Sequence, residues 1–190
     1  MKVRDSGMPA EEMWESFFDP PAILKKLGIN SRIQNVVEFG SGYGTFSLAA
    51  ANIISGNLYA IDLEINMIEL LRNKIVVNNI SNINVIQRDF VTEGTGIENY
   101  SIDYVMMFNI LHAEEPEELL REAYRILRTG GKIGIIHWIY SSDTPRGPSL
   151  DMRPKPEQCI EWLMDSGYRV NKKVIDLPPY HYGLIAKKEN

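Results

Sequence analysis

The chain alternates short apolar segments with helical or turn-rich segments, and this alternation is the feature that most restricts its possible folds. The apolar segments that we expect to be strands are residues 35–39, 57–62, 83–87, 102–108 and 132–138. The run IDYVMMF at 102–108 is almost continuously apolar, which is typical of a strand covered on both faces. Strands that alternate with helices predict a parallel sheet with helices on both faces.

Helical patterns occupy most of the segments between these strands. The helices that we expect are residues 45–54, 65–77, 116–127 and 156–165. The first helical region, residues 10–27, contains Asp19-Pro20-Pro21, and a proline pair should divide it into two short helices. We therefore predict an N-terminal helical cap over residues 1–30 and a single globular domain over residues 31–190.

The last two predicted strands, residues 168–177 and 180–188, are separated only by Pro178-Pro179. A parallel crossover needs a dozen residues or more, so the last strand should run antiparallel to its predecessor. The expected fold is a doubly wound, Rossmann-like α/β sheet of seven strands, with the last strand antiparallel and helices on both faces.

The composition of the chain argues against some classes of partner. The chain has 190 residues, a formal net charge of −5 and one cysteine, Cys159, so it has no basic footprint for nucleic acid and no intramolecular disulfide. The N-terminus lacks an apolar signal core, and no apolar run is long enough to span a bilayer. We expect a cytoplasmic protein with neither a nucleic-acid nor a membrane partner.

A glycine turn, Gly40-x-Gly42-x-Gly44, follows the first strand. In an open parallel sheet ligands bind at the carboxyl ends of the strands, and this turn lies there. Dinucleotide folds use G-x-G-x-x-G, but residue 45 is threonine, so their third glycine is missing. The turn could also be no more than tight packing.

Acidic residues beside the turn indicate the kind of ligand. Glu38, just before the glycines, would repel a pyrophosphate and would favour an ammonium group. Asp62, at the end of the second strand, suits a ribose diol because two hydroxyls can share one carboxylate, although Glu64 could take the ribose instead. A ligand with a ribose, an ammonium group and no phosphate satisfies both acids.

With these residues the chain resembles the class I S-adenosylmethionine-dependent methyltransferases. The segments EFGSGYG, AIDLE and NVIQRDF resemble the first three motifs of that family, and residues 102–138 resemble the later ones. The resemblance implies S-adenosylmethionine as cofactor and methyl transfer to a small-molecule acceptor by direct displacement. The cofactor residues that it implies are Glu38, Gly40, Gly42, Gly44, Asp62, Leu63, Asp89, Phe90 and Asn109.

Other interpretations stand beside these. Asp89 could simply cap a following helix, and the apolar Leu63 and Phe90 could be core residues. Two other functions are an NAD(P)-dependent oxidoreductase and a non-catalytic protein that binds S-adenosylmethionine as a partner or regulator. The missing third glycine and the short final connection argue against the oxidoreductase.

Three histidines, His112, His137 and His181, are predicted at the cofactor end of the sheet. A neutral imidazole there could accept a proton from the acceptor or orient it, so all three are candidate catalytic residues. Each could equally be satisfied by backbone or by packing. Their spacing is not that of a metal-binding motif, so no metal is expected.

Two further segments are candidates for contact with the acceptor. The proline-rich loop at 140–156 carries Arg146 and Arg153, which suit a carboxylate or phosphate, unless they are ordinary solvated charges. In the N-terminal segment, Trp14 and Phe18 are candidate lid aromatics, although packing against the sheet would also explain them. The sequence does not specify the acceptor atom or the oligomeric state.

Overall fold

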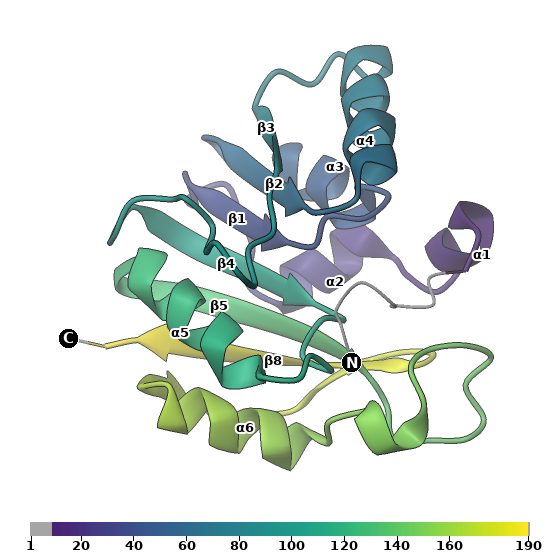
Figure 1. Cartoon of the computed structure of the whole chain (residues 1–190), viewed down its shortest axis with the longest axis vertical. Helices are drawn as coiled ribbons and strands as arrows, with labels where there is room; N and C mark the ends of the chain where they lie inside the picture. Colours follow the sequence, from purple (N-terminus) through teal and green to yellow (C-terminus); the bar gives the residue numbers. More distant parts are fainter. Residues whose placement is uncertain (1–8, 190) are drawn as a thin grey trace.

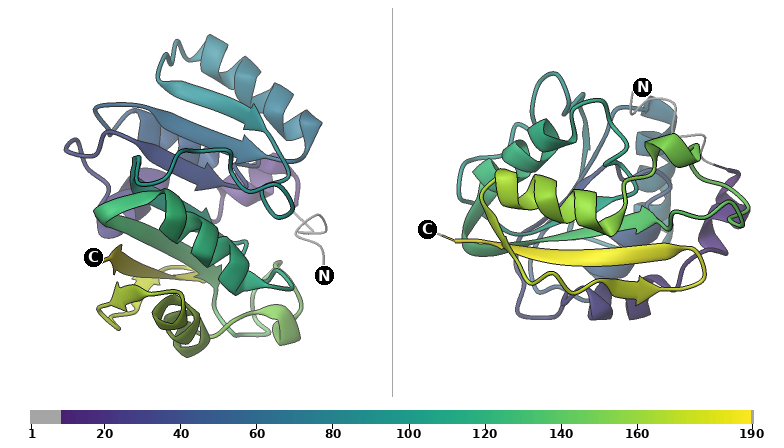
Figure 2. Two further views of the ribbon diagram at one scale, coloured as in Figure 1. Left: turned by 60° about the vertical axis from the view of Figure 1, so that its left-hand side comes forward. Right: turned by 90° about the horizontal axis from the view of Figure 1, so that it is seen from below.

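A computed structural model describes residues 9–189, and its sheet has helices on both faces (Figures 1 and 2). Five strands are mutually parallel in the order β3-β2-β1-β4-β5. They are β1 (Val36–Phe39), β2 (Leu58–Asp62), β3 (Ile83–Gln87), β4 (Ile102–Phe108) and β5 (Leu127–Trp138). Their order reverses between β1 and β4, so the carboxyl ends of these strands form the expected ligand-binding edge.

The last strand, β8 (His181–Lys188), pairs antiparallel with β5 and also runs antiparallel to the strand segments that precede it in the chain, which confirms the expected reversal. Its other side pairs with two short strands, β6 (Tyr168–Val170) and β7 (Ile175–Leu177). The strand predicted over 168–177 is therefore interrupted, and the sheet has eight strands instead of seven. The interruption contains Lys172, whose φ of 52° is incompatible with an extended strand.

Strand alternation divides the core into two layers. Val37 and Phe39 of β1 pack with the helices on one face, whereas Val36 points to the helices on the other. The first layer contains α5 (Pro116–Ile126) and α6 (Pro156–Asp165). The second contains α2 (Pro20–Lys26), α3 (Thr45–Ala51) and α4 (Ile65–Val77).

The N-terminal region joins this fold in two ways. The helix α2 buries Ile23 and Leu24 in the same cluster as Phe46 of α3, so it belongs to the core of the domain. The helix α1 (Glu11–Glu15) buries none of its residues and lies at the edge of the molecule (Figure 1). The first eight residues of the predicted cap lie outside the described residues.

Ionic contacts fasten α1 to the domain. Lys74 of α4 forms ion pairs with Glu11 and with Glu15, the latter at 3.7 Å, and donates a hydrogen bond to the carbonyl of Tyr43 at 2.9 Å. Tyr43 belongs to the glycine turn. A single ammonium group thus connects α1 with the turn that follows β1.

Replacing this ammonium group should release α1 without unfolding the domain. In Lys74→Met we expect backbone amides of residues 11–16 to exchange faster with deuterium, while the free energy of unfolding falls by less than about 1 kcal/mol because the ion pairs are partly exposed. Hydrogen exchange followed by mass spectrometry measures both effects. Arg72→Met, on the exposed side of the same helix, is the matched control, and equal exchange in the two variants would contradict the prediction.

Candidate active site

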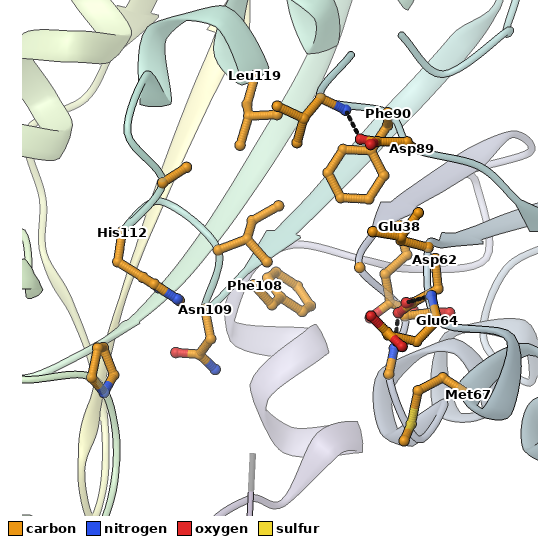
Figure 3. A pocket seen from close by; sticks show the side chains of 18 of the residues that line it. Glu38, Asp62, Glu64, Met67, Asp89, Phe90, Phe108, Asn109, His112 and Leu119 are labelled. Atoms are coloured by element: carbon orange, nitrogen blue, oxygen red, sulfur yellow. Dashed lines mark hydrogen bonds between the residues drawn. The ribbon is translucent and has the colours of Figure 1, made fainter. Parts of the chain in front are cut away.

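A cavity of about 450 Å³ opens at the carboxyl ends of β1, β2 and β4 (Figure 3). Glu38, Asp62 and Met67 lie on one side of it, and His112 and Leu119 lie on the opposite side. Segments from both halves of the sheet therefore meet around one space. We call the first side the cofactor half and the second the acceptor half.

The glycine turn forms part of the cofactor half. Gly40, Gly42 and Gly44 have φ values of 72°, 49° and 77°, a region that favours glycine. Gly40 and Gly42 line the cavity, whereas Gly44 lies outside the lining and caps the N-terminus of α3. A Cβ atom on Gly44 would collide with the side chain of Leu71, so this position also requires close packing.

Asp62 holds the turn in place. One carboxylate oxygen accepts a hydrogen bond from the backbone N–H of Gly42 at 2.8 Å, and the other accepts one from the N–H of Glu64 at 3.0 Å. Each carboxylate oxygen has a further lone pair, so Asp62 can still accept from a ligand hydroxyl. Glu64 also lines the cavity and is more exposed, so both carboxylates considered for the ribose remain within reach of a ligand.

Glu38 is a buried carboxyl group on the cavity wall, with 3% of its surface exposed. The hydroxyl of Ser47 donates a hydrogen bond to it. Burial raises the pKa of Glu38 to about 8, Ser47 opposes this shift, and the nearby charge of Asp62 adds to it. A bound cation would relieve the cost of ionising Glu38 in this environment.

Four side chains carry buried polar atoms that have no hydrogen-bond partner within the described chain and that line the cavity. They are Ser41, Thr45, Asn109 and His112. Buried polar groups are normally paired, so this concentration is what a ligand site requires. The sequence interpretation missed Ser41 and Thr45, although their hydroxyls stand within and just after the glycine turn.

The remaining predicted cofactor residues surround the same space. Leu63, Asp89 and Phe90 all line the cavity, and the ring of Phe90 packs edge-on against Phe39 with centroids 5.2 Å apart. One carboxylate oxygen of Asp89 accepts from the N–H groups of Val91 and Thr92 at 3.2 and 3.3 Å. These bonds organise a turn, not the helix that had been considered.

The three histidines share an end of the sheet but not a face. Trp138 pairs with His181 and His137 pairs with Tyr182, so alternation sends His137 and His181 to opposite sides. Only His112 lines the cavity. His137 is fully buried, with its ring centroid 5.7 Å from that of His112.

Burial keeps these imidazoles neutral. Desolvation lowers the pKa of His112 to about 4 and that of His181 to about 3, and it lowers the pKa of His137 well below its usual range. His181 lies against Phe18 and Trp138, with ring centroids at 4.5 and 4.3 Å. His112 is thus the histidine whose position suits contact with an acceptor.

The loop after β5 is organised by Arg153. Its guanidinium donates to the carbonyls of Pro148 and Ser141 at 2.7 and 3.0 Å and to the hydroxyl of Thr144 at 2.6 Å. It also donates to the carbonyl of Arg146 at 3.1 Å. Arg153 is 7% exposed and Arg146 is exposed, but neither lines the cavity, so this arrangement favours a structural role for Arg153.

One aromatic residue of the N-terminal segment lines the cavity, and others pack against the domain. Trp14 lines the cavity. The ring centroid of Phe18 lies 4.8 Å from that of Trp14 and 5.1 Å from that of Phe46, so Phe18 packs between the N-terminal segment and α3. Phe17 is buried against Trp138. Packing therefore accounts for Phe17 and Phe18, and Trp14 is the aromatic residue of this segment that lines the cavity.

Several cavity residues were not identified from the sequence. Three are exposed glutamates in the connection before α5 and in its first turn, namely Glu114, Glu115 and Glu118. Others are the aromatic and apolar wall residues Phe46, Met67, Phe108, Trp138 and Pro148. The glutamates gave no signal because acids are common at helix N-termini for reasons of helix stability.

Within residues 9–189, no group of three or more histidine, cysteine, aspartate or glutamate side chains could hold a metal ion. No helix in the same part of the chain is long and apolar enough to cross a bilayer.

Comparison with known proteins identifies the class of protein. Residues 36–131, just over half of the chain, match the family model described as a methyltransferase domain, and the chain belongs to this family. A methyltransferase from Aquifex aeolicus described as S-adenosylmethionine-dependent superposes with a TM-score of 0.82 at 23% identity, covering 93% of each chain. Phosphoethanolamine N-methyltransferase 2 of Haemonchus contortus, solved with S-adenosylmethionine, gives a TM-score of 0.73 at 17% identity, over 90% of this chain and 52% of that one.

The name of one sequence relative specifies the molecule that it methylates. The chain is 28% identical over 190 residues to 2-methyl-6-phytyl-1,4-hydroquinone methyltransferase 1 of Oryza sativa, a match that covers 97% of this chain and 54% of the relative. The chain thus spans about half the length of the curated relatives that it matches. The expected family and fold are confirmed.

The site fits the expected cofactor. S-adenosylmethionine carries an ammonium group, a carboxylate and a ribose, and the cofactor half offers a buried carboxyl at Glu38, free hydroxyls at Ser41 and Thr45, and the acceptor capacity of Asp62. When bound, the cofactor supplies an electrophilic methyl group on a sulfonium sulfur.

Cofactor binding should release a proton from Glu38. An ammonium group beside the carboxylate favours its ionised form, so below about pH 8 binding should expel the proton that burial retains. Calorimetric titration with S-adenosylhomocysteine in buffers of different ionisation enthalpy measures this release. We expect close to one proton at pH 7 and close to none in Glu38→Gln; the same release in both proteins would contradict the assignment.

Stability should have a maximum near pH 6.5 to 7. Glu38 has a folded pKa above its unfolded value of 4.5, so its contribution falls as pH rises from 4.5 to about 8. The three histidines have folded pKa values below 6.5, so their contribution is present above pH 6.5 and is lost as pH falls toward 4. Below pH 6.5 three imidazoles outweigh one carboxyl.

Urea unfolding between pH 5 and 9 checks this prediction. The free energy of unfolding should drop steeply on the acid side and gently on the alkaline side. Glu38→Gln should remove the alkaline slope and leave the acid slope, whereas a profile that rises steadily to pH 9 would contradict the burial of Glu38.

Proposed function

We propose that the chain transfers a methyl group from S-adenosylmethionine to a small-molecule acceptor by direct displacement, leaving S-adenosylhomocysteine. One observation carries this proposal. The cavity joins the cofactor half to an acceptor half that contains two buried side chains without polar partners, Asn109 and His112. A protein that only bound the cofactor would not need unpaired polar groups in the acceptor half of the cavity.

In this proposal Glu38 and Asp62 hold the cofactor by its ammonium group and ribose. Asp89 and Phe90 flank the base, and Leu63 and Asn109 complete the enclosure. Each of these residues lines the cavity. Gly44 serves indirectly by allowing α3 to begin beside Leu71.

His112 is the proposed contact to the acceptor. Its pKa of about 4 makes it a neutral hydrogen-bond acceptor at pH 7 and a weak base, so its main task is to orient the nucleophile. His137 and His181 act through their neighbours, because His137 packs behind His112 and His181 packs behind Trp138. Trp14 and Trp138 exclude water from the reacting atoms.

The small size of the acceptor is supported by the dimensions of the site. A cavity of about 450 Å³ shared with a nucleoside leaves room for a small molecule. The hydroquinone named for the Oryza sativa relative is also a small molecule, which favours the same class of acceptor.

Titration calorimetry with S-adenosylmethionine, S-adenosylhomocysteine, NAD and NADP tests the cofactor assignment. We expect saturable binding of the two methionine nucleosides only. Asp62→Asn, which keeps the shape of the side chain but removes its charge, should weaken their binding by about 10-fold or more, in line with the loss of charge-assisted hydrogen bonds. Asp103→Asn, at the opposite end of the sheet, is the control.

Other outcomes have distinct meanings. Binding of the dinucleotides alone would make the chain an oxidoreductase and would overturn the proposal. Binding of the methionine nucleosides without transfer of a labelled methyl group to any acceptor in a broad panel would favour a non-catalytic partner protein. Wild-type turnover in His112→Ala would remove that residue from the acceptor contact.

A further inference from the structure

Glu38 is a carboxyl group on an otherwise apolar face of the sheet. Side chains alternate along β1, so Glu38 points to the same side as Val36, toward the layer that contains α3. Its partners in the neighbouring strands are Ala60 of β2 and Met106 of β4, and both are fully buried. A charged carboxylate in such surroundings is costly unless another group donates a hydrogen bond to it.

Ser47 of α3 provides that hydrogen bond. Its hydroxyl donates to Oε2 of Glu38, and this is the one hydrogen bond that the Glu38 carboxyl makes within residues 9–189. Ser47 is fully buried and does not line the cavity, whereas Glu38 does. Ser47 would therefore act on a ligand in the cavity through Glu38.

Helix formation does not explain why a serine occupies this position. Serine is a weaker helix former than alanine, and residues 49–51 of the same helix are all alanine. A buried hydroxyl also costs stability unless it is paired, and the partner of Ser47 is Glu38. The serine is therefore best explained by what it does for the carboxyl group.

The hydrogen bond leaves one carboxyl oxygen of Glu38 for the cavity. Ser47 bonds to Oε2, so Oε1 can hold a proton or accept a hydrogen bond from a ligand. Burial raises the pKa of Glu38 to about 8, so at pH 7 the carboxyl of the free protein mainly holds the proton. An ammonium group would displace this proton, and the hydroxyl of Ser47 stabilises the carboxylate that remains.

We propose that Ser47 is a positioning residue for the cofactor: its hydroxyl holds the Glu38 carboxylate in the ionised form that receives the ammonium group of S-adenosylmethionine. This inference rests on the proposed function of the same site. A serine that served only the packing of α3 would not change how cofactor binding depends on pH. A serine that stabilises ionised Glu38 would change it.

Other titrating groups near Glu38 come from the neighbouring elements. Asp62 of β2 and Glu64, which precedes α4, lie on the same side of the cavity, and the charge of Asp62 adds to the rise in the pKa of Glu38 (Figure 3). Tyr104 of β4 is neutral because burial raises its pKa, His112 across the cavity is neutral, and α3 has no charged residue. A comparison of two variants at the same pH cancels the ionisation of these groups and of the ligand.

The pH dependence of S-adenosylhomocysteine binding tests the role of Ser47. At pH 7 binding must ionise Glu38, so Ser47→Ala should weaken binding about tenfold, in line with the loss of a hydrogen bond to a charged group. At pH 9.5 Glu38 is ionised before the ligand binds, so the difference should fall below about twofold. Calorimetric titration from pH 6.5 to 9.5 measures both. Alanine favours helices, so the variant should fold.

Proton release is a second measurement of the same effect. At pH 8 the Glu38 carboxyl of the wild type is about half ionised, so binding should release about half a proton. In Ser47→Ala the carboxyl should keep its proton to higher pH, and the release at pH 8 should rise toward one proton. Calorimetry in buffers of different ionisation enthalpy measures this release.

Three further variants serve as controls. In a Glu38→Gln background, Ser47→Ala should change binding by less than about twofold at every pH, because no carboxylate remains to be stabilised. Ser166→Ala removes another buried hydroxyl, at the end of α6 and outside the cavity lining, and should leave binding unchanged. Ser47→Thr keeps the hydroxyl and should keep the wild-type pH profile.

The outcomes separate this proposal from the one on which it rests. Failure of S-adenosylhomocysteine to bind the wild-type chain overturns the proposed function itself. With that binding intact, the proposal for Ser47 is overturned if Ser47→Ala weakens binding equally at all pH values or binds as tightly as Ser166→Ala at pH 7. It is also overturned if the effect of Ser47→Ala persists in the Glu38→Gln background.

Discussion

The bidentate contact of Asp62 is the interaction on which the site depends. Its carboxylate joins the backbone of Gly42, in the turn after β1, to the backbone of Glu64, at the start of α4. Parallel pairing of Phe39 with Ile61 brings these two segments side by side. Because both oxygens are held by N–H groups, the turn is fixed by contacts within the chain, which lowers the cost of organising it around a ligand.

Many buried polar groups of the core are paired within the described chain, and those without partners include Ser166, His137 and His181 outside the cavity as well as groups that line it. In the core, the hydroxyl of Tyr104 donates to the carbonyl of Leu27 at 2.8 Å and that of Tyr168 to the carbonyl of Leu120 at 3.0 Å. Around the cavity, Ser41 and Asn109 keep buried polar atoms without partners. Unpaired buried groups cost stability, so the position of Ser41 and Asn109 on the cavity wall is best explained by ligands that would pair with them.

The charges of the residues that line the cavity also matter for ligand binding. The described lining of the cavity contains seven acidic residues and one neutral histidine, and Arg153 is bound to the loop that it organises. A cofactor with a net positive charge would be attracted to such a space, whereas the demethylated product, which has no net charge, would be held less strongly. The same negative charges would then favour both the binding of the cofactor and the release of its product.

The sequence by itself determined the alternation of strands and helices, the antiparallel last strand and the glycine turn with its neighbouring acids, because these depend on local patterns and on a connection too short for a crossover. Only the tertiary structure decided the rest. Lys172 breaks a strand that its neighbours favoured, strand alternation places His137 and His181 on opposite faces, and Arg153 is consumed by carbonyls of its own loop. The acceptor half is assembled from a connection, a helix and a loop distant in sequence, and which of their side chains reach the cavity depends on packing that no local pattern encodes.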